Sequence, residues 1–77
     1  MHDSEKLEDA RRALREKLPP WGTKWRHRET GDVYHLIGGV LIEATVAPAV
    51  AYSPVDGTDV WVRPLDEFLE NFEEVRK

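Results

Sequence analysis

Apolar residues recur with two different periods along this 77-residue chain, and the change of period divides it into two parts. In residues 4–18 the apolar positions recur at helical spacing, and the pair Pro19-Pro20 follows them. The helical stripe consists of Leu7, Ala10, Leu14 and Leu18. From residue 24 onward, apolar and polar residues alternate as they do in strands. The pattern therefore predicts an N-terminal helix within residues 1–20 and a small β-barrel domain in residues 21–77.

The stripe on the predicted helix is narrow, and two arrangements would bury it. The helix can lie on the rest of its own domain, or two copies of the chain can pair through the leucines as a homodimer. Two heptads are too few to require a coiled coil. We therefore expect the first arrangement and keep the homodimer as the alternative.

A first hairpin is predicted by the segments KWRHR and VYHLI, which flank the turn sequence ETGD. With residues 29–32 as the loop, the cross-strand pairs are Arg28–Val33, His27–Tyr34, Arg26–His35 and Trp25–Leu36. One face then carries Trp25, His27, Tyr34 and Leu36, and the other carries Arg26, Arg28, Val33 and His35. The pair Gly38-Gly39 predicts a bend or bulge before the next strand, which the sequence Val46-Ala47-Pro48 turns back.

A second hairpin is predicted by Asp56-Gly57. Its register gives the pairs Tyr52–Trp61, Ala51–Val62 and Val50–Arg63. The last segment fits either one short helix or a helical turn after Pro64 that leads into a final strand, and we expect the second. Four or five short antiparallel strands with tight turns predict a mainly β fold. We expect a strongly bent, SH3-like barrel, preceded by the N-terminal helix, with few free sheet edges.

Composition narrows the class of protein. Hydrophobic residues make up 40% and charged residues 34%, which is typical of a compact domain. The start of the chain is too polar for a secretory signal, and no apolar run approaches the roughly 20 residues of a membrane span. We therefore expect a cytoplasmic protein with no membrane partner. Without cysteine, burial alone must stabilise the domain.

The net charge of −4 is divided unevenly: residues 1–32 carry +1 and residues 33–77 carry −5. A nucleic-acid-binding domain is usually net basic, and this one is not. One local cluster keeps that interpretation open. It consists of Lys24, Arg26 and Arg28.

Catalytic groups are scarce, so we expect no enzyme. The chain has two serines, Ser4 in the N-terminal tail and Ser53 in a predicted turn, and no cysteine to act as a nucleophile. His27 and His35 alternate to opposite faces of the predicted hairpin and cannot share an ion. Zinc normally takes three or four protein ligands. We therefore expect neither a metal site nor a cofactor.

Glu43 is the only Asp, Glu, Lys or Arg between Val33 and Val55. A carboxylate in so apolar a segment either points outward or has a partner, because burying it alone is costly. The candidate partners are Arg63 and His27. Our hypothesis is an ion pair between Glu43 and Arg63.

The best candidate for a binding site is an aromatic and basic face on the second hairpin. Tyr52, Trp61 and Arg63 share one face, and the opposite face carries Ala49, Ala51, Val60 and Val62. If these small residues line the barrel, the first three stay partly outside, a combination enriched at binding hot spots. Alternatively, Trp61 fills the core and Arg63 lies over it. Further candidates are Trp25, His27, Tyr34 and Glu43.

Three segments carry a resemblance to a known family: WRHRETGDVYHLIG, EATVAPAVAY and VWVRPLDEF. Together they resemble a family of small bacterial and phage-encoded domains with no assigned function. The likeness covers about residues 24–70, and its most specific part is the Trp-Val-Arg-Pro segment. Members of this family look like SH3-like barrels, and the resemblance implies no reaction.

We therefore expect a non-catalytic interaction module that binds an unidentified protein or peptide through Tyr52, Trp61 and Arg63. The aromatic rings would supply contact area, and Arg63 would hold a carboxylate or a backbone carbonyl. The alternative is a nucleic-acid-associated accessory protein that uses the hairpin from Lys24 to Arg28, with Trp25 stacked on a base.

Overall fold

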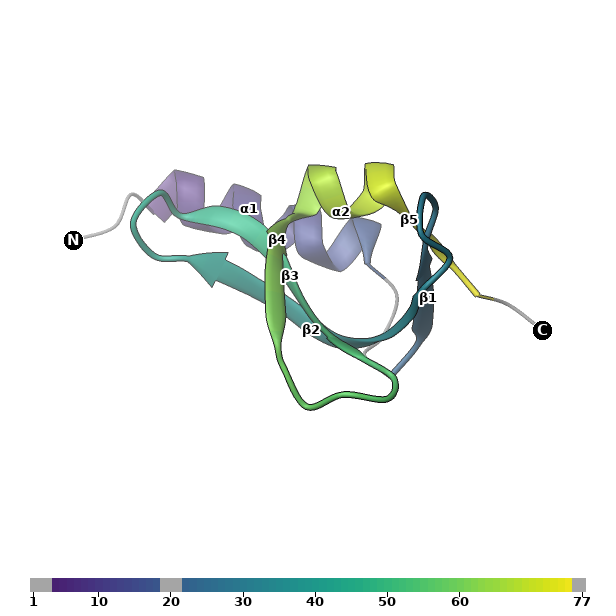
Figure 1. Cartoon of the computed structure of the whole chain (residues 1–77). Helices are drawn as coiled ribbons and strands as arrows, with labels where there is room; N and C mark the ends of the chain where they lie inside the picture. The colour runs from purple at the N-terminus through teal and green to yellow at the C-terminus, as the bar shows by residue number, and fades with distance from the viewer. Residues whose placement is uncertain (1–3, 19–21, 76–77) are drawn as a thin grey trace.

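The computed structural model describes residues 4–18 and 22–75. Its elements are α1 (Ser4–Lys17), β1 (Lys24–His27), β2 (Val33–Ile42), β3 (Ala47–Pro54), β4 (Trp61–Pro64), α2 (Leu65–Asn71) and β5 (Phe72–Glu74). The strands form one antiparallel sheet in the order β4-β3-β2-β1-β5 (Figure 1). This confirms the predicted fold class: mainly β, with an N-terminal helix and a helical turn after Pro64 that leads into a last strand.

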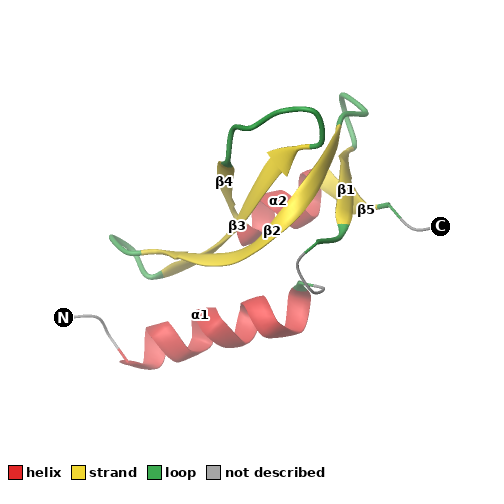
Figure 2. Cartoon of the chain, turned by 90° about the horizontal axis from the view of Figure 1, so that it is seen from below, coloured by secondary structure: helices red, strands yellow, loops and turns green. Residues whose placement is uncertain are grey.

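The sheet is strongly bent and stays open. β4 and β5 are its two edges, and α2 connects them across the concave side (Figure 1). The bend in β2 coincides with a shift of register between Leu36 and Gly38, where the glycine pair predicted a bulge. Beyond it, β2 and β3 continue as a long hairpin that runs beside α1 (Figure 2).

The first hairpin differs from its predicted register by two residues. β1 pairs with β2 through Lys24–His35, Trp25–Tyr34 and Arg26–Val33. The loop comprises residues 28–31, because the His27 N–H bonds to the Asp32 carbonyl at 2.8 Å and Gly31 has φ +81°. Glycine adopts this left-handed conformation at least cost, so it occupies the last loop position. Since the shift is even, each side chain stays on its predicted face.

The turn between β2 and β3 lies earlier than predicted. It comprises residues 43–46, and β3 already includes Ala47 and Pro48. The residue in the left-handed region is Val46, with φ +54°. A β-branched residue is rare in that conformation, so the sequence carried no signal for this turn. The second hairpin, in contrast, has the predicted register, with pairs Tyr52–Trp61, Ala51–Val62 and Val50–Arg63.

The core lies between the concave face of the sheet and α2. It consists of Trp25, Leu36, Val50, Tyr52, Leu65, Phe68 and Phe72. The rings of Phe68 and Phe72 stack with their centroids 4.5 Å apart, and Trp25 lies 5.0 Å from Phe68. Large aromatic rings supply much of the buried area that so small a domain needs.

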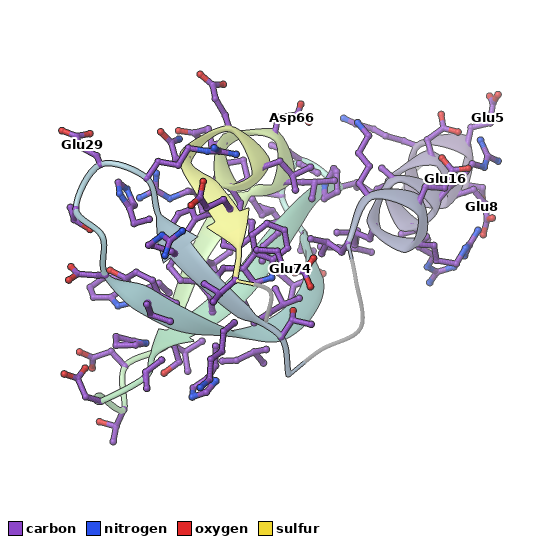
Figure 3. All side chains as sticks on the ribbon, turned by 90° about the vertical axis from the view of Figure 1, so that its right-hand side faces the viewer. Glu5, Glu8, Glu16, Glu29, Asp66 and Glu74 are labelled. Carbon is purple, nitrogen blue, oxygen red and sulfur yellow. The ribbon has the colours of Figure 1, made fainter. Side chains whose placement is uncertain are left out.

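α1 docks on its own domain, as in the first of the two predicted arrangements. Ala10 is buried, and Ala13, Leu14 and Leu18 pack against the core. The helix approaches β2 where a Cβ on Gly39 would lie 2.9 Å from a Leu14 methyl group. Acidic side chains occupy its outer side: Figure 3 shows Glu5 and Glu8 pointing away from the sheet. The boundary between the two predicted segments, at residues 20 and 21, lies outside the described residues.

Candidate interaction surface

Three half-buried side chains from three strands surround the buried ring of Phe72. The ring centroids of His27 and Tyr34 lie 4.8 and 5.5 Å from that of Phe72, and the guanidinium carbon of Arg63 lies 5.5 Å from it. Trp61 pairs with Tyr52 across β3 and β4. Because Trp61 and Arg63 are two residues apart on β4, their side chains lie on the same face of the sheet. We call these four residues, His27, Tyr34, Trp61 and Arg63, the aromatic-basic face.

Trp61 is the most exposed member of this face. It is 52% exposed on the edge strand β4, and its neighbours Val60 and Val62 are 59% and 55% exposed. The alternative in which Trp61 fills the core is therefore wrong, because α2 covers the sheet closer to its centre and leaves β4 at the margin. A tryptophan this exposed, between two exposed valines, is the largest apolar feature of the β4 edge.

Two residues predicted for the binding face belong to the core instead. Tyr52 is 5% and Trp25 is 6% exposed. The prediction was wrong for them because α2 packs on the face that carries Tyr52, not on the alanine face. Ala49 and Ala51 are also buried, so small size on one face did not identify the side on which the helix packs.

Arg63 is held in place by a tyrosine hydroxyl group and an aromatic ring. Its Nε donates to the hydroxyl oxygen of Tyr52 at 3.2 Å, and its guanidinium lies over Phe72. Among residues 4–18 and 22–75, no Asp or Glu forms an ion pair with it. The guanidinium thus keeps further N–H donors for a ligand.

The hypothesised ion pair between Glu43 and Arg63 is not formed. Val50 pairs with Gly39 on one side and Arg63 on the other. Glu43 follows Gly39 by four residues, which is about 13 Å along a strand. It borders a separate groove with Leu7, Leu41 and Val46.

An acidic cleft adjoins Tyr34. Its volume is about 490 Å³, and it is lined by Asp32, Val33, Tyr34, Pro54, Val55 and Asp56. Burial, followed by the negative charge of Asp32, raises the pKa of the Tyr34 phenol above its ordinary value of 10.0. The hydroxyl group is therefore a neutral donor at physiological pH. Sequence reasoning missed this cleft because Asp32 and Asp56 sit in different loops, and only the pairing of β2 with β3 brings them together.

The basic residues of the first hairpin are largely neutralised by β5. Glu73 accepts hydrogen bonds from Nε and a terminal nitrogen of Arg26, and from Arg28 at 3.2 Å. Lys24 is exposed on the same strand. Because Glu73 occupies both arginines, this hairpin presents less free positive charge than the sequence suggested. The structure therefore does not favour the nucleic-acid alternative.

Glu73 predicts a specific dependence of stability on acid. The hydrogen bond from Arg26, then its positive charge and that of Arg28, lower the pKa of Glu73 below 4.5. A lowered pKa contributes stability above the unfolded pKa, and this contribution is lost as pH falls through the folded pKa. Urea unfolding at pH 7 and pH 3 should therefore show a smaller acid loss for Glu73→Gln than for the wild type. Glu70→Gln, which removes an exposed carboxylate from α2, is the control. Equal acid losses in wild type and Glu73→Gln would contradict the prediction.

Within the described part of the chain, no group of three or more His, Asp or Glu side chains is placed to hold a metal ion. His27 faces Phe72, and His35 alternates to the other side of the sheet, as predicted. No helix in residues 4–18 or 22–75 is long and apolar enough to cross a membrane.

The family described as "Protein of unknown function (DUF1653)" matches residues 23–77. The chain belongs to this family. The DUF1653 match includes all five strands and α2, and α1 lies before it. Neither the curated proteins nor the solved structures give a significant match.

Proposed function

We propose that this DUF1653 protein is a non-catalytic interaction module that binds a protein or peptide through its aromatic-basic face. One observation carries the proposal: a half-exposed tryptophan lies on an edge strand beside an arginine that forms no ion pair with any carboxylate of the described residues. Trp and Arg are the residue types most enriched at binding hot spots.

The two side chains are suited to different parts of a partner. Trp61 offers a large, rigid apolar surface whose burial is favourable. Arg63 is fixed by Tyr52 and Phe72, so its fork loses little conformational freedom when a carboxylate binds. A partner that combines an apolar group with a carboxylate therefore matches this face best.

The acidic cleft beside Tyr34 places negative charge next to the aromatic-basic face. Asp32 and Asp56 border one side of the face, and Arg63 supplies positive charge on the other. A partner segment is thus oriented by charge, with its carboxylate at Arg63 and any cation toward the cleft. Such complementarity contributes mainly to specificity and to the association rate.

Affinity capture from a bacterial lysate tests this function. The baits are the wild type, Trp61→Ala and Ile37→Ala, the last removing an exposed apolar side chain of β2 that is not part of the aromatic-basic face. We expect a protein that the wild type and Ile37→Ala recover and Trp61→Ala loses. Recovery of the same proteins by all three folded baits, or of nucleic acid alone, would contradict the proposal.

A further inference from the structure

The outer edge of β4 offers free backbone hydrogen-bonding groups. The Val55 N–H, just after β3, bonds to the Val33 carbonyl. The backbone N–H and C=O groups of the odd-numbered residues 53 and 55 therefore point to β2. The backbone N–H and C=O groups of Val50 and Tyr52 therefore point to β4. Those of their partners, Arg63 and Trp61, point back to β3. Val62 consequently points its N–H and C=O away from the sheet. β4 forms the margin of the sheet in Figure 2.

Pro64 agrees with this assignment. Pro64 lies two residues after Val62, so its backbone is directed the same way, to the outside, where its missing N–H leaves no gap in the pairing with β3. An edge strand with free polar groups and exposed apolar side chains is a template for another strand, unless the edge is short, charged or covered. This edge is short but exposes three large apolar residues in a row, Val60, Trp61 and Val62.

The sequence of this edge allows it to pair in antiparallel fashion with a second copy of itself. Residues 59–63 read Asp-Val-Trp-Val-Arg, so the apolar residues are symmetric about Trp61 and the ends carry opposite charges. An antiparallel pair of two such strands, centred on Trp61, places Val60 opposite Val62 and Asp59 opposite Arg63. The Asp59 side chain is exposed, and Arg63 forms no ion pair with a described carboxylate.

We propose that two copies of this chain associate through their β4 edges, with a twofold axis at Trp61. This inference rests on the proposed function, because it names a second copy as the partner of the aromatic-basic face. Val60 and Val62 exchange backbone hydrogen bonds across the new boundary, and the two Trp61 side chains meet on one side of the joined sheet. Each Arg63 receives the carboxylate of Asp59 from the other copy. Because a twofold pair uses the same patch twice, the association closes at a dimer.

The charge pattern selects a second copy over an unrelated strand. Any extended segment could bond to Val62, but residues 59–63 also satisfy both charged ends and both valine positions of this edge. Parallel pairing in register would place like charges opposite each other. A shift of the antiparallel register by two residues would place Trp61 opposite Asp59 or Arg63 and would lose both ion pairs. The pairing is small, and we expect dimerisation to depend on concentration.

Two charge reversals test the pairing by sedimentation of the full chain over a wide range of concentration. Asp59→Lys alone places two cations opposite each other in both pairs, and Arg63→Glu alone places two anions there. Each is expected to raise the dimer dissociation constant about tenfold or more. An equimolar mixture of the two variants restores both attractive pairs and should form the heterodimer. Glu70→Lys makes the same charge change on α2, outside residues 59–63 and outside the aromatic-basic face, and should dimerise like the wild type.

The outcomes separate this inference from the proposed function. A wild type that sediments as a monomer of 8.9 kDa at every concentration would overturn the dimer, while a Trp61-dependent partner in the capture experiment would still support the interaction module. A dimer that neither charge reversal weakens would also overturn the β4 pairing and point to another face, such as α1. Folding of Arg63→Glu, which loses its bond to Tyr52, is checked by circular dichroism. If Arg63→Glu does not fold, the comparison of Asp59→Lys with Glu70→Lys decides alone.

Discussion

Phe72→Ala is expected to lower the free energy of unfolding by about 3–5 kcal/mol. The Phe72 ring is 1% exposed and contacts the rings of four other residues, His27, Tyr34, Tyr52 and Phe68. It also underlies the guanidinium of Arg63. Removing the ring leaves a cavity, because its neighbours lie on α2 and on separate strands whose pairing holds them in place. The loss would be a large fraction of the total stability of a domain, which is about 5–15 kcal/mol.

Urea unfolding followed by tryptophan fluorescence measures this effect. Val60→Ala, at a side chain that is 59% exposed, is the control and should change stability by less than about 0.5 kcal/mol. The arrangement of the aromatic-basic face depends on Phe72, so the variant should also lose binding. A Phe72→Ala variant as stable as Val60→Ala would show that Phe72 does not fill the core.

Gly39→Val is expected to destabilise the protein by about 1–3 kcal/mol through overpacking. A Cβ at position 39 would lie 2.9 Å from one Leu14 methyl group and 3.1 Å from the other. Valine adds two more methyl groups at this position, so either the Leu14 side chain must leave its rotamer or α1 must move away from β2. The expected loss therefore reports the docking of the N-terminal helix on its own sheet.

A double-mutant cycle with Leu14→Ala identifies the contact. Shortening Leu14 makes room for the valine, so the double variant should cost less than the sum of the two single variants, by about 0.5–3 kcal/mol. Strict additivity would mean that Gly39 and Leu14 do not touch in solution. Helix docking through this contact would then be contradicted.

The sequence predicted the elements well where local chemistry determines them. The apolar stripe gave α1, Asp56-Gly57 gave the register of the second hairpin, and Pro64 marked the start of α2. The bulge at Gly38 also followed from composition. The predicted positions of two turns were wrong because the residue that determines each turn was ambiguous in the sequence. Gly31 could occupy either of two loop positions, and Val46 adopts a conformation that its side chain usually disfavours.

The candidate site was predicted in part, because alternation assigns residues to a face but does not say which face is covered. His27, Tyr34, Trp61 and Arg63 lie near one another, as expected. Tyr52 and Trp25 were misplaced because the position of α2 depends on contacts distant in sequence. For the same reason the roles of Phe72 and Glu73 could not be foreseen: both depend on β5 pairing with β1.

We propose that this domain binds a partner through its β4 edge, where Trp61 is exposed. Amide hydrogen exchange at Val62, compared with that at Trp61 and Arg63, tests it most directly. In dilute protein, the Val62 amide should exchange rapidly, while the other two, directed to β3, are protected. When the chain associates with itself or with a captured partner, exchange at Val62 should slow markedly. A Val62 amide already protected in the monomer, or unchanged on association, would contradict the account.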